Sequence, residues 1–183
     1  LGHEGGIGHK NLVFSTVGDR RVFERLPLGT VKPALALSLH STDAARRAEL
    51  LPRAPQIAPD ELVELGERYA RASGYPIQYQ WTLLKGINDG DDELDGIVRL
   101  LRGKYALLNM IPYNRIDGLA FERPAAERAE AIARTLQGRG VLTKLRQSAG
   151  QEVDAGCGQL RARVIRIAPA APAPAAAAVP TGV

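Results

Sequence analysis

The sequence predicts an α/β protein in which parallel strands alternate with helices. Short apolar segments recur along the chain, and longer amphipathic stretches with helix-capping residues follow most of them. The composition is that of an ordinary globular domain, with 45% hydrophobic and 24% charged residues. Four or five parallel strands with helical crossovers fit either part of a β/α barrel or half of an open doubly wound sheet. The pattern of elements alone leaves both arrangements open.

Each predicted element has a local reason in the sequence. Thr42 or Asp43 can cap the first long helix, whereas Pro59 suits the first turn of the next helix and Gly74 suits its end. Turn residues at 88–90 precede an acidic stretch that favours a helix start. The expected strands cover residues 11–15, 34–39, 77–84, 105–112 and 141–146, and the expected helices cover 43–51, 59–74, 91–101 and 124–137, with only a short irregular connection between 15 and 34.

Polar side chains stand at the ends of several predicted strands. They are Ser15, Ser38, His40, Asn114, and Lys85 with the stretch that leads from it to residues 88–90. Taken singly, such residues are more typical of turns and caps. In a β/α barrel, however, ligand-binding groups collect where the strands end. Hydroxyl, imidazole and amide groups that face one mouth suit a zwitterionic ligand that carries a ribose.

Cys157 is the single cysteine of the chain, so an internal disulfide and an all-cysteine metal site within this chain are excluded. It lies between Gly156 and Gly158, which allow the backbone to bend and move. We interpret it as a nucleophilic thiol, activated if a basic residue lies near it in space. The alternative is an inert buried cysteine, which the polar surroundings disfavour. The stretch NDGDDE lacks the ligand spacing of a calcium loop, so we expect no metal site.

The net charge of +4 is unevenly placed. Residues 139–166 hold six basic residues against two acidic ones, an excess equal to that of the whole chain. A basic stretch beside a reactive residue favours a polyanionic partner such as RNA, and a solvated surface is the alternative. We find neither an apolar run long enough to cross a bilayer nor a secretory signal, and we expect a cytoplasmic protein without a membrane partner.

The chain resembles the radical S-adenosylmethionine (SAM) adenine C2-methyltransferases of 23S ribosomal RNA and some transfer RNAs, the RlmN/Cfr family. Five motifs carry the resemblance and occur in the family's order. They are FSTVG (14–18), LALSLHS (35–41), LLKGINDG (83–90), LNMIPYN (108–114) and DAGCGQL (154–160). The resemblance covers roughly residues 11–166 and implies a partial parallel β/α barrel of the radical SAM type with a C-terminal extension.

The resemblance also implies roles for individual residues. Ser15, Ser38, Leu39, His40 and Asn114 correspond to the residues that bind SAM. Cys157 corresponds to the cysteine that one SAM molecule methylates, after which a radical made from a second SAM at a [4Fe-4S] cluster activates the methyl group for addition to C2 of adenine. The implied partners are 23S rRNA, with a tRNA as an alternative substrate, and an electron donor for the cluster. The resemblance leaves open whether C8 is methylated in place of C2.

The sequence departs from the family pattern because the cluster cysteines and the resolving cysteine are missing. Met110 is the only methionine, so we expect residues 1–10 to be the remnant of a truncated upstream part. We divide the rest into the second half of a barrel (11–138), a segment with the last strand and the active cysteine (139–167) and a disordered Ala/Pro tail (168–183). We expect the chain alone to be inactive.

Three rival interpretations remain open. The chain could be a degenerate domain that has lost the chemistry, a non-catalytic RNA-binding module, or an unrelated barrel enzyme that acts on a phosphorylated metabolite. The last of these predicts a phosphate-binding glycine loop after a late strand, which we do not find in the sequence.

Overall fold

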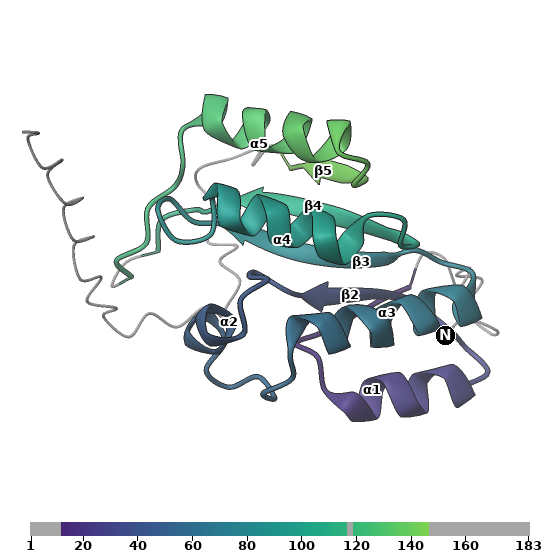
Figure 1. Ribbon diagram of the computed structural model, residues 1–183. Coiled ribbons are helices and arrows are strands. Elements are labelled where there is room, and N and C mark those ends of the chain that lie inside the picture. Colours follow the sequence, from purple (N-terminus) through teal and green to yellow (C-terminus); the bar gives the residue numbers. More distant parts are fainter. Residues whose placement is uncertain (1–11, 117–118, 147–183) are drawn as a thin grey trace, which may run out of the picture.

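The computed structural model describes residues 12–116 and 119–146. It contains one five-stranded parallel sheet in the order β1-β2-β3-β4-β5 (Figure 1). The elements are β1 (Val13–Thr16), α1 (Arg20–Arg25), the 3-10 helix η2 (Leu26–Leu28), β2 (Ala34–Ser38), α2 (Ala44–Leu50), α3 (Pro59–Ser73), β3 (Ile77–Leu83), α4 (Asp91–Leu101), β4 (Ala106–Pro112), α5 (Ala126–Gly138) and β5 (Thr143–Leu145).

The order of the strands and the placement of the helices distinguish the two predicted arrangements. Successive strands are neighbours in the sheet, and α1, α3, α4 and α5 lie on the same face of it (Figure 1). A doubly wound sheet reverses its strand order and has helices on both faces. Sequential strands with helices on one face are the arrangement of part of a β/α barrel, which confirms the predicted fold class.

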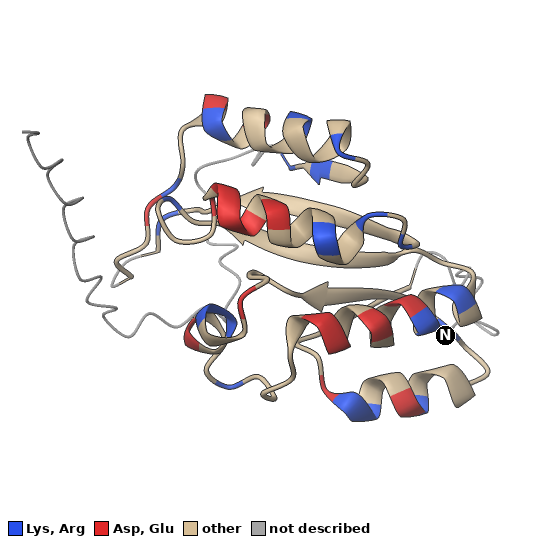
Figure 2. Cartoon of the chain, in the orientation of Figure 1, with Lys and Arg blue, Asp and Glu red and all other residues tan. Residues whose placement is uncertain are grey.

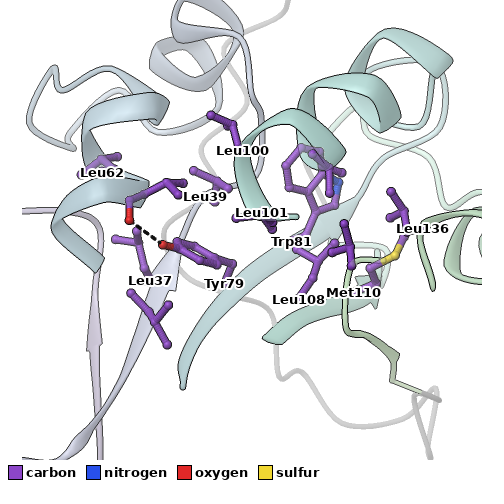
Figure 3. Close-up of a cluster of buried hydrophobic side chains, with 14 of the residues drawn as sticks. Leu37, Leu39, Leu62, Tyr79, Trp81, Leu100, Leu101, Leu108, Met110 and Leu136 are labelled. Carbon is purple, nitrogen blue, oxygen red and sulfur yellow. Dashed lines mark hydrogen bonds between the residues drawn. The ribbon is translucent and has the colours of Figure 1, made fainter. Parts of the chain in front are cut away.

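The hydrophobic core lies between the sheet and these helices. Every second residue of β3 points into it, with Tyr79 and Trp81 at its centre, both 0% exposed (Figure 3). Leu37 of β2 and Leu108 of β4 extend the same layer across the sheet. The Tyr79 hydroxyl donates a hydrogen bond to the carbonyl of Val63 on α3, at 3.3 Å. This bond gives a partner to the one polar atom of the buried ring.

Most predicted helix ends are confirmed. The Asp43 side chain accepts a hydrogen bond from the backbone N–H of Arg46 at 2.7 Å, as expected of a helix cap. Gly74 ends α3 in the left-handed conformation, with φ of 76°. At the other end of the chain, β5 is shorter than the strand we expected. Within the described residues, none of the helices has the length and apolar character needed to cross a membrane.

The predicted irregular connection between the first two strands was wrong. Helix α1 and η2 occupy this segment. The Asp19 side chain accepts from the backbone N–H of Arg21 at 2.9 Å and so caps α1, and Phe23 packs into the core. A six-residue helix with one buried side chain shows little periodicity, because such a helix depends on tertiary packing more than on local propensity.

Gly66 is a point of close contact between α3 and the sheet. A Cβ atom there would stand 2.5 Å from Ile77 Cδ1 and 2.6 Å from the Tyr79 hydroxyl. We predict that Gly66→Ala lowers the free energy of unfolding by about 1–3 kcal/mol through overpacking, measured by urea denaturation. Gly138→Ala at the end of α5 is the control, because nothing lies within 4 Å of its Cβ position. Equal stability of the two variants would contradict this packing.

Candidate functional site

The face of the sheet that points away from the core carries a row of polar side chains. Side chains alternate between the two faces of a strand. Since Leu37, Tyr79, Trp81, Leu108 and Met110 face the core, their sequence neighbours face the other way. The register pairs Ser38 with Gln80, Gln80 with Asn109, and Asn109 with Lys144. We call Ser38, Gln80, Asn109 and Lys144 the polar row.

The polar row contains a hydroxyl, two amides and an ammonium group on four neighbouring strands. The Asn109 side chain also donates to the Gln78 side chain at 3.2 Å, which ties β4 to β3 on the same face. Amides can both donate and accept hydrogen bonds, and the lysine only donates. Lys144 is exposed, Ser38 and Gln80 are half-buried, and Asn109 is 2% exposed. The accessible part of the row can bind a ligand that carries both hydroxyl and carboxylate groups.

Two of the predicted ligand-binding residues lie on this face. Ser15 pairs in register with Ala36, two residues before Ser38, so both serine hydroxyls lie on the polar side of adjacent strands. Leu39 differs, because its side chain is 0% exposed and belongs to the hydrophobic core. Its backbone N–H donates to the Gln80 carbonyl at 3.1 Å. A ligand on this face would therefore not meet the Leu39 side chain.

His40 is buried beside the end of β3. It is 1% exposed, and its Nδ1 accepts a hydrogen bond from the backbone N–H of Thr82 at 2.9 Å. Its backbone has φ of 60°, a conformation that side chains other than glycine and asparagine seldom adopt. Burial, with a smaller effect from the nearby positive charge of Arg47, lowers the pKa of His40 to about 4. The ring is therefore neutral at pH 7, with its proton on Nε2.

The Nε2 atom of His40 is buried and has no hydrogen-bond partner in the part of the chain that the structure describes. A buried N–H without a partner is costly, and a native protein tolerates it where function or a missing ligand requires it. This atom is therefore a candidate donor to a ligand at the carboxyl end of β2.

Asn88 holds the end of β2 against the end of β3. Its side-chain NH₂ group donates to the His40 carbonyl at 2.8 Å and to the Thr82 carbonyl at 2.9 Å. Its side-chain oxygen accepts from the backbone N–H of Leu84 at 2.8 Å. The sequence placed residues 88–90 in a turn at a polar strand exit, and the structure shows in addition that Asn88 fixes His40.

Glu93 holds the loop that follows His40. It is 1% exposed at the start of α4, and it accepts hydrogen bonds from the Ser41 hydroxyl, from the Thr42 hydroxyl and from the Thr42 backbone N–H at 2.7 Å. Arg46 on α2 adds an ion pair at 2.6 Å. Gly96, one turn further along α4, faces the Thr42 side chain so closely that a Cβ atom would clash with it. Helix α4 is thus fastened to the loop.

Arg47 supports the ends of β1 and β2 from the helix side. Its guanidinium group donates to the carbonyls of Val17 at 2.6 Å and Ser38 at 3.2 Å, and the residue is 3% exposed. Burial lowers its pKa to about 10, so it stays charged at neutral pH. This charge adds to the larger effect of burial in disfavouring a positive charge on His40.

Asn114 follows β4 by two residues, at the same edge of the sheet as His40. Its side-chain oxygen accepts a hydrogen bond from Arg123 at 3.4 Å. The structure thus places Ser15, Ser38, His40 and Asn114 at the carboxyl ends of three strands, as the sequence predicted. Cys157, Gly156 and Gly158 lie outside the described residues.

Sequence reasoning missed Glu93, Arg47 and the inner members of the polar row. An acidic residue in the first turn of a helix is already explained by the helix dipole, so Glu93 gave no further signal. Gln80, Asn109 and Lys144 could have been found only from the register of the strands, because they are far apart in the sequence.

The ligands of a [4Fe-4S] cluster are not supplied by this chain. Such a cluster is held by several cysteine thiolates, whereas the chain has one cysteine. The described residues also contain no group of three or more His, Cys, Asp or Glu side chains that could hold a metal ion. The hydroxyls of Ser15 and Ser38 and the amide of Gln80, by contrast, are groups that would hold the ribose and the carboxylate of a cofactor such as SAM.

We predict that the pH dependence of stability reports on His40. Its folded pKa of about 4 lies below its ordinary value of 6.5, so between these two pH values the unfolded chain binds a proton that the folded chain does not. Stability should therefore be fully present above pH 6.5 and fall as the pH drops toward 4, by up to about 1.4 kcal/mol per pH unit.

The matched variant is His40→Asn, because asparagine tolerates the positive φ, offers an acceptor to Thr82 and does not titrate. Urea denaturation between pH 7 and pH 4.5 should show a weaker loss of stability for this variant than for the wild type. Parallel pH profiles would contradict the burial of an uncharged ring.

We predict that Glu93→Gln lowers the free energy of unfolding by about 2–4 kcal/mol, because an amide cannot replace a carboxylate that accepts several hydrogen bonds and an ion pair. Urea denaturation measures the change. Asp95→Asn on the same helix is the control, since Asp95 pairs with Arg139 at the surface, and its loss should cost less than about 1 kcal/mol. An equal effect of the two changes would show that Glu93 does not hold the loop.

Comparison with models of known protein families finds no match. Comparison with curated proteins finds close relatives that are named "probable RNA methyltransferase". One from Methylibium petroleiphilum is 74% identical over 165 residues, which are 90% of this chain and 47% of the relative. One from Aromatoleum aromaticum shows the same identity and the same coverage. The chain therefore spans about half the length of the curated relatives it matches.

Solved structures show a similar fold. A radical SAM methyltransferase from Sphaerobacter thermophilus is 32% identical, with a TM-score of 0.79 over 87% of this chain and 48% of that protein. A domain of a pyruvate-formate lyase-activating enzyme from Bacteroides vulgatus has a TM-score of 0.58 at 14% identity, over 74% of this chain and 80% of that domain, and supports the fold alone. The polar face thus stands in a chain that is similar to about half of a radical SAM methyltransferase.

Proposed function

We propose that this chain is the C-terminal half of a radical SAM RNA methyltransferase that methylates C2 of an adenine in 23S rRNA, with Cys157 as the carrier of the methyl group. The observation that carries the proposal is the position of Ser15, Ser38 and His40 at the carboxyl ends of the adjacent strands β1 and β2. The names of relatives that are 74% identical support methyl transfer to RNA. The motif DAGCGQL supports the role of Cys157 through its resemblance to the RlmN/Cfr family.

SAM is the cofactor that the polar face suits. Its ribose hydroxyls can pair with the hydroxyls of Ser15 and Ser38, and its amino acid group can pair with Asn114. The neutral His40 ring offers its Nε2–H without adding charge beside the sulfonium group. When bound, SAM supplies the methyl group and the source of the hydrogen-abstracting radical. The cluster that such a radical needs would be held by cysteines that this chain does not supply, and a separate partner would donate the electron.

Cys157 contributes a nucleophile that can receive a methyl group and then present its carbon to an RNA base. A thiol loses its proton more readily near positive charge, and Lys144 and Arg146 lie 13 and 11 residues before it. The carbon must reach C2 of adenine, which is electron-poor and does not attack a methyl cation. A second substrate in tRNA, or transfer to C8, would use the same residues of this chain.

We predict that Cys157→Ala in the full-length enzyme reduces RNA methylation to background, whereas RNA binding and thermal stability stay near the wild-type values. Transfer of labelled methyl groups from SAM to rRNA measures the activity, and mass spectrometry of the active wild-type enzyme should find a methyl group on the Cys157 sulfur. Full activity of Cys157→Ala would refute the carrier role. If the full-length wild type binds RNA but never methylates it, the chain is instead part of an RNA-binding protein.

A further inference from the structure

A second hydrophobic cluster joins the loops at the carboxyl end of the sheet. Its buried members come from the end of α2 and from the loops that follow α2, β3 and β4, and they are Leu50, Leu51, Ala54, Leu84, Tyr113 and Phe121. The rings of Tyr113 and Phe121 pack edge to face with centroids 5.8 Å apart. We call these six residues the rim cluster. It brings loops that are far apart in the sequence into one packed unit beside the candidate site.

The rim cluster carries exposed arginines on its outer side. Arg53 lies between Leu51 and Ala54, and Arg115 and Arg123 lie on either side of Phe121 in the loop between β4 and α5. All three are exposed, and none forms an ion pair with a described carboxylate. Because the loops pack against each other, these positive charges share one edge of the molecule.

The helices differ from the rim in this respect. Figure 2 shows acidic and basic segments side by side along α3 and α4. Many of these charges neutralise one another through the ion pairs Arg20–Glu61, Arg99–Asp60, Lys104–Glu64 and Arg139–Asp95. In the loop between β4 and α5, Glu122 is paired with Lys85 at 2.8 Å, and the second acid, Asp117, lies outside the described residues. Among the described residues, Arg115 and Arg123 therefore have no carboxylate partner and stay available to a polyanion.

The rim also contains a hollow with two arginines in its lining. Its volume is about 460 Å³, and it is lined by Arg115, Leu119, Ala120, Phe121, Glu122 and Arg123. The Glu122 carboxylate is paired with Lys85, so the two guanidinium groups beside the apolar wall suit a phosphate group. Arg123 also donates to Asn114, so the hollow adjoins the candidate SAM site.

We propose that Arg53, Arg115 and Arg123 bind the phosphate backbone of the RNA substrate beside the nucleotide that enters the polar face. The proposal rests on the proposed function, since it takes RNA as the substrate. Guanidinium groups match phosphate oxygens in charge and in geometry. Contacts to phosphates fix the position of RNA without reading its sequence. The rim thus positions the strand, while the polar face and Cys157 act on one base.

The test compares two double variants of the full-length enzyme. Arg53→Gln/Arg115→Gln removes two rim charges. Arg68→Gln/Arg102→Gln removes two exposed charges from α3 and from the end of α4, which form no ion pair among the described residues. Affinity for an rRNA fragment that contains the methylated adenine is measured across a range of salt concentrations. For the rim variant we expect affinity roughly tenfold lower at low salt and a slope of log K against log salt shallower by about 1.5.

The control variant should keep the wild-type slope, and both variants should keep the wild-type affinity for SAM and the wild-type melting temperature. Arg53→Lys/Arg115→Lys should restore most of the slope, since lysine also binds phosphate. A wild-type slope in the rim variant, or an equal loss in the control variant, would overturn the proposal. A full-length wild type that binds RNA without methylating it would refute the proposed function. The salt slopes of the rim and control variants would still test whether the rim arginines bind RNA.

Discussion

The structure depends on the register of parallel pairing among β2, β3 and β4. Because side chains alternate along each strand, one register places Leu37, Tyr79 and Leu108 together on the core side. The same register places Ser38, Gln80 and Asn109 together on the other side. A shift of one residue would bury the amides among hydrocarbon and expose the core. Stability and a candidate ligand-binding face are therefore consequences of a single geometric constraint.

Buried polar side chains hold the loops at the carboxyl ends of the strands. Their hydrogen bonds restrict each loop to few conformations. Asn88, in the loop after β3, holds the backbone of His40. Glu93 on α4 holds Ser41 and Thr42. Arg47 on α2 holds the ends of β1 and β2. A buried polar network of this kind is rigid when every member is paired, and it is costly when one is not. A ligand that binds here would meet groups already in position, and so would not have to order them.

Much of the fold could be predicted because short sequence patterns indicate strands, through a period of two, and helices, through their capping residues. Helix α1 could not be predicted, since six residues with one buried Phe23 give no periodic signal.

The candidate site likewise has a part that the sequence predicted and a part that it did not. Ser15, Ser38 and Asn114 stand next to strand ends that the sequence shows, and so their shared edge was predictable. Glu93 and Lys144 act together with partners that lie about 50 and 35 residues away in the sequence. Only folding brings those partners near, so the sequence alone did not reveal them. Cys157 stays a prediction, because it lies outside the described residues.

The polar face and the rim differ in whether their contacts with a ligand require water to be excluded. Phosphate contacts at the rim work in solvent, because long-range charge attracts RNA and the contacts tolerate exchange. Amides and hydroxyls on the polar face bind selectively only where water is excluded, and parallel sheets are as a rule covered on both faces. Within residues 12–116 and 119–146 the helices of the sheet cover one face, and β1 leaves Val13 and Phe14 exposed, at 52% and 43%. The relatives are about twice as long as the matched part. The other half of a barrel would cover the polar face and the apolar edge strand β1. Half of a barrel would therefore leave these two surfaces uncovered.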